Sequence, residues 1–240
     1  MNSILESILV AQQESFHPVV DFEPGIDKVA PLDISGSNKA FTQEIYNNPE
    51  RFQQYINETR KSANARYLIG GYRELRTMYS RSVLFNKDIR EENSEQDEPR
   101  SLHLGMDIWA DAGVPIYAPL GGMVHSLAFN NNFGDYGATI ILQHQLDTAN
   151  FYTLYGHLSL KDLGEKRVGQ FITRGEKFAH FGPWEENGNW PPHLHFQVIL
   201  DMGNWEGDYP GVCKMSEAIK YLQNSPDPDL IAQLKRYISV

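Results

Sequence analysis

The sequence predicts a mainly β protein, built as an antiparallel sheet or partly closed barrel, with helices towards both ends of the chain. The first observation is a series of short β-rich runs between residues 103 and 201, separated by turn residues. The second is a helix signal at Asn48-Pro49-Glu50, and the third is a return to helix-favouring sequence after residue 202. The 240 residues suffice for one large domain, or for one domain with a helical extension.

The β-rich runs are bounded by glycines and by polar turn residues. They are Val114–Ala118, Met123–Phe129, Ala138–Gln143, Asn150–Leu158 and His193–Leu200. Four segments follow from this pattern. They are a helical or irregular N-terminal extension packed on the core (1–86), an acidic loop (87–102), a β domain (103–201) and a C-terminal helical extension (202–240).

The two predicted helical regions have identifiable start signals. Asn48 is a suitable N-cap and Pro49 a suitable first-turn residue, and apolar side chains then recur every three to four positions. Ser216 is expected to cap a helix over 217–222, and the proline-rich stretch 225–229 should separate it from a last helix near 230–238. Residues 72–86 are ambiguous between helix and strand.

The composition excludes several classes of function. Hydrophobic residues make up 41% and charged residues 22%, as in ordinary globular proteins. The net charge of −10 argues against nucleic-acid binding and against docking on anionic membranes. No run approaches the roughly 18 apolar residues of a membrane span. The N-terminus has no basic region before its short apolar run, so we expect a cytoplasmic protein, and a monomer.

Two further features have competing interpretations. Cys213 is the only cysteine, which excludes an internal disulfide framework; it is either a nucleophile or a small buried residue. Residues 87–101 are polar and acidic, with five acidic side chains in the run 91–98, and are either a solvated loop or a rim that contacts substrate. Residues 87–101 lie directly upstream of His103, and residues 183–192 lie directly upstream of His193 and His195. We therefore expect both stretches to flank a groove that contains these histidines.

Three short segments carry the candidate chemistry. In His103-Leu-Gly-Met-Asp107, an extended backbone would place His103, Gly105 and Asp107 on one face, with Gly105 leaving space for an ion. Alone, this pattern is also common by coincidence on surfaces. In His193-Leu-His195, a strand would place both imidazoles on one face, about 6.6–6.8 Å apart. That separation suits one histidine on a metal and the other beside it, although such a pair can equally be structural.

The third segment is Tyr155-Gly156-His157-Leu158, where a single histidine alone would usually be structural. Taken in order, His103-x-Gly-x-Asp107, Tyr155-x-His157-Leu and His193-x-His195-Phe resemble the signature of the M23 peptidases, which include lysostaphin and LytM. The resemblance covers residues 103–200 and includes the stretches 118–124, 140–144 and 168–172.

The resemblance implies a lysostaphin-like sheet of the duplicated hybrid motif type, with Zn²⁺ at the floor of a groove. It implies that His103, Asp107 and His195 are the metal ligands and that His157 and His193 are the catalytic histidines. Two histidines and one carboxylate leave an open zinc position for water, as catalytic zinc sites require. Zinc lowers the pKa of such a water to about 7, and the two histidines can then transfer protons.

The resemblance leaves two functions open. The first is a zinc-dependent metalloendopeptidase acting on peptide or muropeptide-like substrates. The alternative is a cytoplasmic M23-like module that binds zinc but serves a non-murein hydrolytic or binding role. The chain departs from the family by having Trp184 and Trp190 before the histidine pair, where they either line a substrate groove or anchor a long loop. His144 is interpreted as structural, and Gly71-Tyr72-Arg73 only faintly resembles a Gly-x-Arg element of the family.

Overall fold

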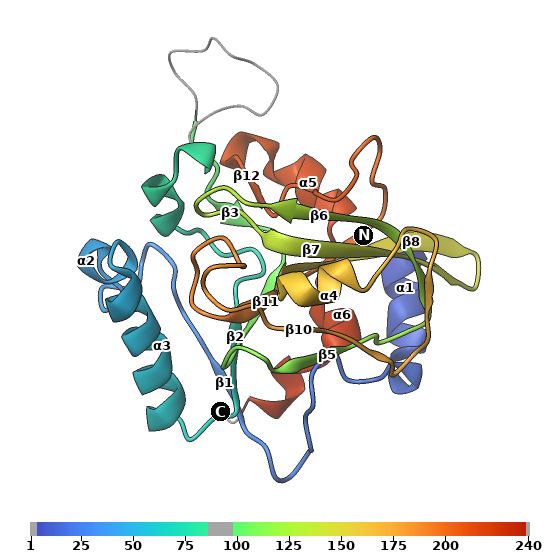
Figure 1. The fold of residues 1–240 in the computed structure, drawn as a ribbon, viewed down its shortest axis with the longest axis horizontal. Helices are drawn as coiled ribbons and strands as arrows, with labels where there is room; N and C mark the ends of the chain where they lie inside the picture. The colour runs from blue at the N-terminus through green and yellow to red at the C-terminus, as the bar shows by residue number, and fades with distance from the viewer. Residues whose placement is uncertain (1–3, 86–97, 239–240) are drawn as a thin grey trace.

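A computed structural model describes residues 4–85 and 98–238 of the chain. Its centre is an eight-stranded mixed sheet, and two short two-stranded sheets lie beside it (Figure 1). In spatial order, the strands of the main sheet are β1 (Val29–Pro31), β2 (Tyr67–Gly70), β4 (Met106–Trp109), β11 (His193–Ile199), β8 (Ala149–Leu158), β7 (Gly137–Leu146), β6 (Gly122–Asn130) and β9 (Phe171–Ile172). The two small sheets pair β5 (Pro115–Tyr117) with β10 (Lys177–His180), and β3 (Leu102–His103) with β12 (Val212–Cys213).

The prediction of a mainly β protein is confirmed, but the described strands form no closed barrel. The main sheet has β1 and β9 as its two edges. Only β1 and β2 pair in parallel; the other neighbours in this sheet are antiparallel. The predicted strands at 114–118, 123–129, 138–143, 150–158 and 193–200 all appear, shifted by a few residues at their ends.

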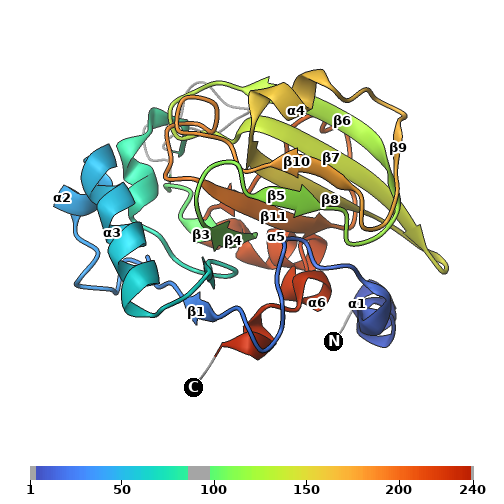
Figure 2. The same ribbon diagram turned by 60° about the horizontal axis from the view of Figure 1, so that its bottom comes forward.

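The helices surround the sheet on several sides. Figure 2 shows α2 and α3 at one side of the molecule, α1 and α6 beneath the sheet, and α4 above it. Their bounds are α1 Ile4–Ala11, α2 Gln43–Tyr46, α3 Pro49–Ser62, α4 Leu160–Gly164, α5 Ala218–Asn224 and α6 Asp229–Ala232. Short 3-10 turns occupy Gln13–Ser15, Met78–Arg81, Val83–Phe85, Met215–Glu217 and Lys235–Tyr237. Among the described residues, no helix has the length and apolar character to cross a bilayer.

The helix that starts after Asn48 forms as its sequence predicts. The Asn48 side chain accepts a hydrogen bond from the backbone N–H of Arg51 at 3.0 Å, and Pro49 occupies the first turn. Phe52 and Ile56 lie one turn apart and are buried. The prediction for Ser216 is wrong, because this residue lies in a 3-10 turn and α5 begins at Ala218 without a side-chain cap.

The N-terminal segment contributes more to the sheet than its sequence predicted. Strand β2 pairs with β4, and β1 extends the sheet beyond β2. The run Tyr67-Leu-Ile is buried on both faces, so it lacks the polar alternation that identifies a half-exposed strand. The ambiguous stretch 72–86 contains 3-10 turns rather than a helix or strand, as far as residue 85. The division into four segments stays a prediction.

The alternation along β11 separates the main core from the candidate site. Leu194, Phe196 and Val198 point into the main hydrophobic core, whereas His193, His195 and Gln197 point to the other face. On the neighbouring β4, Met106 and Ile108 belong to the same core. Asp107 and Trp109 therefore share the face of the histidines. All these residues are buried, so both faces of the sheet are covered here.

Candidate metal centre

The histidine pair and the aspartate are brought together by the register of two adjacent strands. His195 on β11 lies directly opposite Asp107 on β4, and His193 lies opposite Trp109. The rings of His193 and Trp109 stack at 3.9 Å with an interplanar angle of 14°. His103 reaches the same point from β3, where it pairs with Val212 of β12. Together with His157, whose position is described below, these residues make up the five that the sequence predicted as ligands or catalysts. All five lie in one region.

The expectation that residues 103–107 form one extended strand is wrong. β3 ends at His103 and β4 begins at Met106, and the two strands belong to different sheets. Gly105 lies in the break. A Cβ atom at this position would be 2.4 Å from Cε1 and 2.5 Å from Nε2 of His195. The space that Gly105 leaves is therefore filled by the His195 ring and not by an ion.

Three electron-pair donors converge where a cation would fit. His103 Nε2 and His195 Nδ1 are 2.9 Å apart, and Asp107 Oδ1 is 3.4 Å from the first and 3.2 Å from the second. A tetrahedral zinc site with bonds of about 2.0–2.1 Å separates its ligand atoms by about 3.3 Å. Within the described part of the chain, these three residues form the only group of histidine, cysteine or acidic side chains with metal-ligand spacing.

The hydrogen-bond partners of the two rings fix which nitrogens carry lone pairs. His103 Nδ1 is 3.0 Å from the carbonyl oxygen of Gly71, which can only accept, so Nδ1 carries the proton. His195 Nε2 is 3.0 Å from Gln197 Oε1, and the Gln197 amide is oriented by donating to the carbonyl of Pro210. The lone pairs of His103 Nε2 and His195 Nδ1 therefore face each other and Asp107. Without a cation between them, these atoms repel one another.

The second carboxylate oxygen of Asp107 is held by Arg76. Arg76 is 2% exposed; its Nη1 donates to Asp107 Oδ2 at 2.6 Å and its Nε donates to Glu74 Oε2 at 2.6 Å. Burial alone would favour the protonated form of Asp107, but His103 and Arg76 outweigh it and hold the pKa of Asp107 well below its usual range. Asp107 is thus an anionic ligand with Oδ1 left for a metal.

His157 reaches the site because β8 is irregular at this point. Alternate residues Phe151 and Tyr155 point into the main core, so regular alternation would send the side chain of residue 157 there as well. The pairing of β7 with β8 shifts register between Ala138 and Ile140, and His157 has a φ of 62°. Such a bulge redirects a side chain, and here it places the His157 ring 4.1 Å from the His193 ring.

His157 and His193 are both poised as neutral proton acceptors. The Nδ1 of His157 donates to the carbonyl of Asn187 at 2.7 Å, and the Nδ1 of His193 donates to the carbonyl of Pro191 at 2.7 Å. Each Nε2 therefore carries a lone pair. Burial lowers the pKa of His193 to about 4, and burial together with His193 lowers the pKa of His157 well below its usual value.

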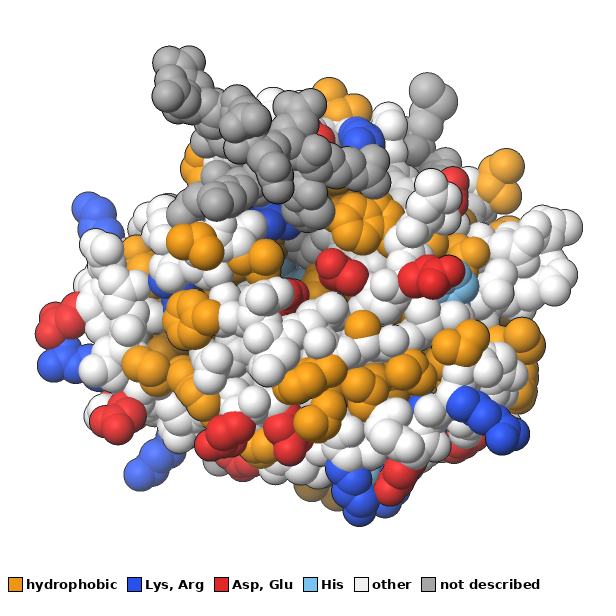
Figure 3. Space-filling view, turned by 45° about the horizontal axis from the view of Figure 1, so that its top comes forward, with side chains coloured by type: hydrophobic (Ala, Val, Ile, Leu, Met, Phe, Trp, Pro, Cys, Tyr) orange, Lys and Arg blue, Asp and Glu red, His pale blue; other side chains and the backbone are white. Residues whose placement is uncertain are grey.

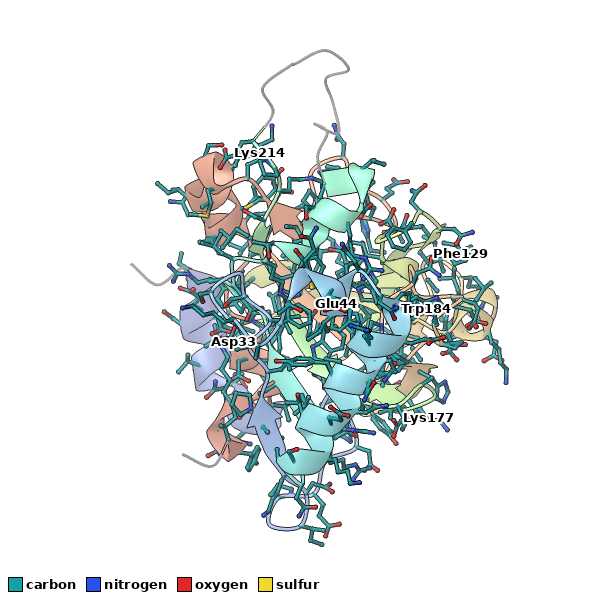
Figure 4. The ribbon with its side chains drawn as sticks, turned by 90° about the vertical axis from the view of Figure 1, so that its left-hand side faces the viewer. Asp33, Glu44, Phe129, Lys177, Trp184 and Lys214 are labelled. Carbon is teal, nitrogen blue, oxygen red and sulfur yellow. The ribbon has the colours of Figure 1, made fainter. Side chains whose placement is uncertain are left out.

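These residues line a cavity of about 240 Å³. Figure 3 shows the surface hollowed here, with histidine at the floor and acidic side chains along the rim. Trp190 lines the cavity, whereas Trp184 lies outside it, against the residues of α3 (Figure 4). Tyr136 also lines the cavity, and its ring lies 5.1 Å from the ring of His195.

Sequence reasoning missed Arg76 and Tyr136. Both come from irregular segments, and neither carries a local pattern that distinguishes it from other residues of its type. The faint Gly71-Tyr72-Arg73 match points to the right segment, because Gly71 accepts the His103 hydrogen bond, but Arg73 is exposed. The basic residue of the site is Arg76.

The remaining candidates lie elsewhere or are explained by packing. Both ring nitrogens of buried His144 have partners, the carbonyl of Gly121 and the hydroxyl of Thr153, as a structural histidine requires. Cys213 is buried and burial raises the pKa of its thiol to about 12, which does not suit a nucleophile. Of the acidic stretch 87–101, residues up to 97 lie outside the described part of the chain; Arg100 lines the cavity.

Comparison with known proteins identifies similar chains. Residues 101–205 match the model of peptidase family M23. The chain is 30% identical over 115 residues to the L-Ala--D-Glu endopeptidase of Bacillus subtilis (strain 168), covering 46% of this chain and 33% of that protein. It is 31% identical over 99 residues to an uncharacterized metalloprotease of Haemophilus influenzae, covering 41% of this chain and 19% of that protein. The chain thus spans about a third of the length of the Bacillus protein and about a fifth of the length of the Haemophilus protein.

Solved structures with detectable similarity include two peptidases. A zinc containing peptidase from Vibrio cholerae is 29% identical, with a TM-score of 0.33, over 41% of this chain and 27% of that chain. The catalytic domain of lysostaphin from Staphylococcus simulans is 18% identical, with a TM-score of 0.37, over 72% of this chain and 98% of that chain.

Proposed function

We propose that this protein, whose residues 101–205 match the model of peptidase family M23, is a zinc-dependent metalloendopeptidase that hydrolyses peptide amide bonds, including bonds of the peptidoglycan type. The observation that carries the proposal is the convergence of His103 Nε2, His195 Nδ1 and Asp107 Oδ1 with their lone pairs directed at one point. Two imidazoles and one carboxylate are the ligand set of a hydrolytic zinc site with an open position. The name of the Bacillus relative supports a substrate of the L-Ala–D-Glu type.

In this proposal His103, Asp107 and His195 hold the metal. When bound, zinc supplies a Lewis acid that polarises water and the scissile carbonyl. Asp107 can bind through Oδ1 alone, because Arg76 holds Oδ2. Gly71 and Gln197 keep the two ligand rings in the tautomers that direct lone pairs at the metal.

His157 and His193 are proposed to move the protons. Their Nε2 atoms are unprotonated at neutral pH, and the His193 Nε2 lies 4.0 Å from Asp107 Oδ1. One of them can take a proton from the attacking water and a protonated imidazole can then deliver it to the leaving amine. The carbonyls of Asn187 and Pro191 hold the Nδ1–H groups and so fix the orientation of both rings.

A metal-removal experiment tests the proposal. We expect about one zinc per chain in protein purified without chelators, cleavage of at least one member of a peptide and muropeptide panel, loss of cleavage after chelation, and recovery with zinc. His125→Ala is the control, because this histidine bonds to Ser126 and is not among the residues that line the cavity. Zinc binding without any cleavage would contradict the peptidase proposal and favour a binding role. Neither zinc binding nor cleavage would contradict the metal site itself.

Two expectations remain predictions. The monomeric state is tested by sedimentation at several protein concentrations. The cytoplasmic location is tested by fractionation of cells that express the native gene, and recovery mainly from the periplasm or the medium would overturn it.

A further inference from the structure

The loop before β11 is tied together by one buried side-chain amide. Asn187 is 0% exposed, and its Nδ2 donates to the carbonyls of Gly182 and Trp190, at 3.2 and 2.9 Å. Its Oδ1 accepts a hydrogen bond from the backbone N–H of Trp190 at 3.0 Å. A carbonyl can only accept and a backbone N–H can only donate, so these partners fix the amide in one orientation. Both donors of the Asn187 amide are therefore in use, and its oxygen is bonded as well.

One end of this network holds His157. The backbone carbonyl of Asn187 accepts a hydrogen bond from His157 Nδ1 at 2.7 Å. Gly182, which accepts from the Asn187 amide, donates its own N–H to the carbonyl of His157 at 2.8 Å. The ring and the backbone of His157 are thus both held by groups that the amide joins. His157 has a φ of 62°, which residues other than glycine rarely adopt, so its conformation depends on such contacts.

The other end of the network holds His193. Its Nδ1 donates to the carbonyl of Pro191 at 2.7 Å, and Pro191 directly follows Trp190. Both the N–H and the carbonyl of Trp190 are hydrogen-bonded to the Asn187 amide. The Trp190 carbonyl belongs to the planar peptide group that leads into Pro191, so holding it sets the direction in which the chain continues. The carbonyl that accepts from His193 is positioned in this way.

The loop is also docked onto the connection between β6 and β7 by its backbone. A Cβ atom at Gly188 would lie 1.8 Å from the carbonyl oxygen of Asp135, and one at Gly137 would lie 2.1 Å from the carbonyl oxygen of Glu186. The N–H of Gly134 donates to the carbonyl of Gly188 at 2.9 Å. These contacts do not use the buried amide. Variants that shorten this one side chain should therefore remain folded, with the loop in place.

We propose that Asn187 is a positioning residue, whose side-chain amide keeps both His157 and His193 in the tautomer with the proton on Nδ1 and none on Nε2. This rests on the proposed function, which assigns proton transfer to these two rings. A neutral imidazole that loses its Nδ1 acceptor can carry its proton on either nitrogen. With the proton on Nε2, the ring cannot take a proton from the attacking water through that atom. Asn187 is not among the residues that line the cavity, so it acts through the two histidines.

The test measures the tautomers directly. Long-range nitrogen–proton correlation spectra of protein with isotope-labelled histidine are recorded at neutral pH, with and without zinc, and assigned with His157→Gln and His193→Gln. Asn187→Ala removes all three hydrogen bonds of the amide. In Asn187→Ser the hydroxyl can still accept from the N–H three residues on, but no amide nitrogen is left for the carbonyl of Gly182. Asn189→Gly is the matched control, because it removes an amide from the same loop and glycine readily adopts the φ of 65° found there.

We expect the wild type and Asn189→Gly to carry the proton on Nδ1 of both histidines. Asn187→Ala should show mixed tautomers at His157 and His193. It should keep its zinc stoichiometry and lose about 10- to 100-fold in kcat, with little change in KM. Asn187→Ser should restore the tautomer of His193, leave that of His157 mixed, and lose less in kcat than Asn187→Ala. Unfolding curves show that each variant is folded, and Asn187→Ser decides by the same readouts if Asn187→Ala is not.

Unchanged tautomers in Asn187→Ala, or mixed tautomers without a loss in kcat, would overturn the proposal. A loss confined to KM or to zinc content would also overturn it, because a merely structural loosening of the cavity gives that result. The spectra do not require activity, so the outcome is separable from that of the proposed function. A wild type that cleaves no peptide, with mixed tautomers in Asn187→Ala, would contradict the peptidase and leave the positioning of the rings standing. Cleavage by a wild type whose tautomers do not depend on Asn187 would do the reverse.

Discussion

Gly105→Ala perturbs the proposed metal site without changing any ligand. The added Cβ would be 2.4 Å from Cε1 of His195 and 3.0 Å from the carbonyl oxygen of Phe196. Carbon atoms in contact are normally about 3.5–4.0 Å apart, so the imidazole or the backbone has to move by about 1 Å. His195 is 2% exposed and is hydrogen-bonded to Gln197, so the ring cannot swing into open space.

A displacement of about 1 Å far exceeds the roughly 0.2 Å tolerance of a zinc bond, so His195 should be lost as a ligand. We expect zinc affinity to fall by more than about 100-fold. This exceeds the loss expected when a metal ligand keeps its position but loses the residue that hydrogen-bonds to it. We also expect the metal-free protein to lose about 1–3 kcal/mol of stability through overpacking. Competition with a chromogenic zinc chelator measures the first quantity and urea unfolding the second.

Gly164→Ala is the matched control, because a Cβ atom there meets nothing within 4 Å. It should leave zinc affinity unchanged. If Gly105→Ala binds zinc within a few-fold of Gly164→Ala, then either His195 is not a ligand or the site is looser than its contacts indicate, and the reasoning is refuted.

Three further predictions concern buried charge. Burial lowers the pKa of His144 from about 6.5 in the unfolded chain to about 4 in the folded protein. The wild type should therefore lose up to about 3 kcal/mol of stability relative to His144→Gln as pH falls from about 6.5 to 4. An unfolding free energy that changes equally with pH in both proteins, measured by chemical denaturation, would contradict this. Burial and the neighbouring Asp135 raise the pKa of Asp208 to about 6, so ionisation of this carboxyl group opposes folding. Asp208→Asn should therefore stabilise the protein by about 1–3 kcal/mol above pH 6 and by little near pH 4. A gain in unfolding free energy that does not depend on pH would refute this. Arg76→Met should cost about 3–5 kcal/mol in urea unfolding because it leaves buried Asp107 unpaired, whereas Arg51→Met at an exposed ion pair should cost less than about 1 kcal/mol; equal costs would contradict the role of Arg76.

Local patterns in the sequence were sufficient to predict part of the site. The alternation His193-Leu-His195-Phe predicts a strand with both histidines on one face, and β11 has that arrangement. Period-two alternation depends only on the strand itself, so it can be recognised without knowing the partners. The same holds for Asn48 as an N-cap, because its hydrogen bond reaches only three residues along the chain.

The features that were missed depend on contacts between distant segments. Arg76 meets Asp107 across 31 residues, and Tyr136 approaches His195 across 59 residues. The bulge that turns His157 towards the site is set by register against β7, which no pattern within β8 determines. The role of Gly105 was misassigned for the same reason, because its neighbour in space is a ring from the other end of the domain.

The central claim is that His103, Asp107 and His195 hold one zinc ion while His157 and His193 transfer protons. His193 and His195 are two residues apart on one strand face, so alanine substitutions at these positions separate the two roles most directly. Zinc content and peptide cleavage rate should be measured on the same preparations of both variants. The account predicts that His195→Ala loses zinc, whereas His193→Ala keeps about one zinc per chain and loses about 10²–10⁴-fold in rate. Loss of zinc in His193→Ala with retention in His195→Ala would contradict it.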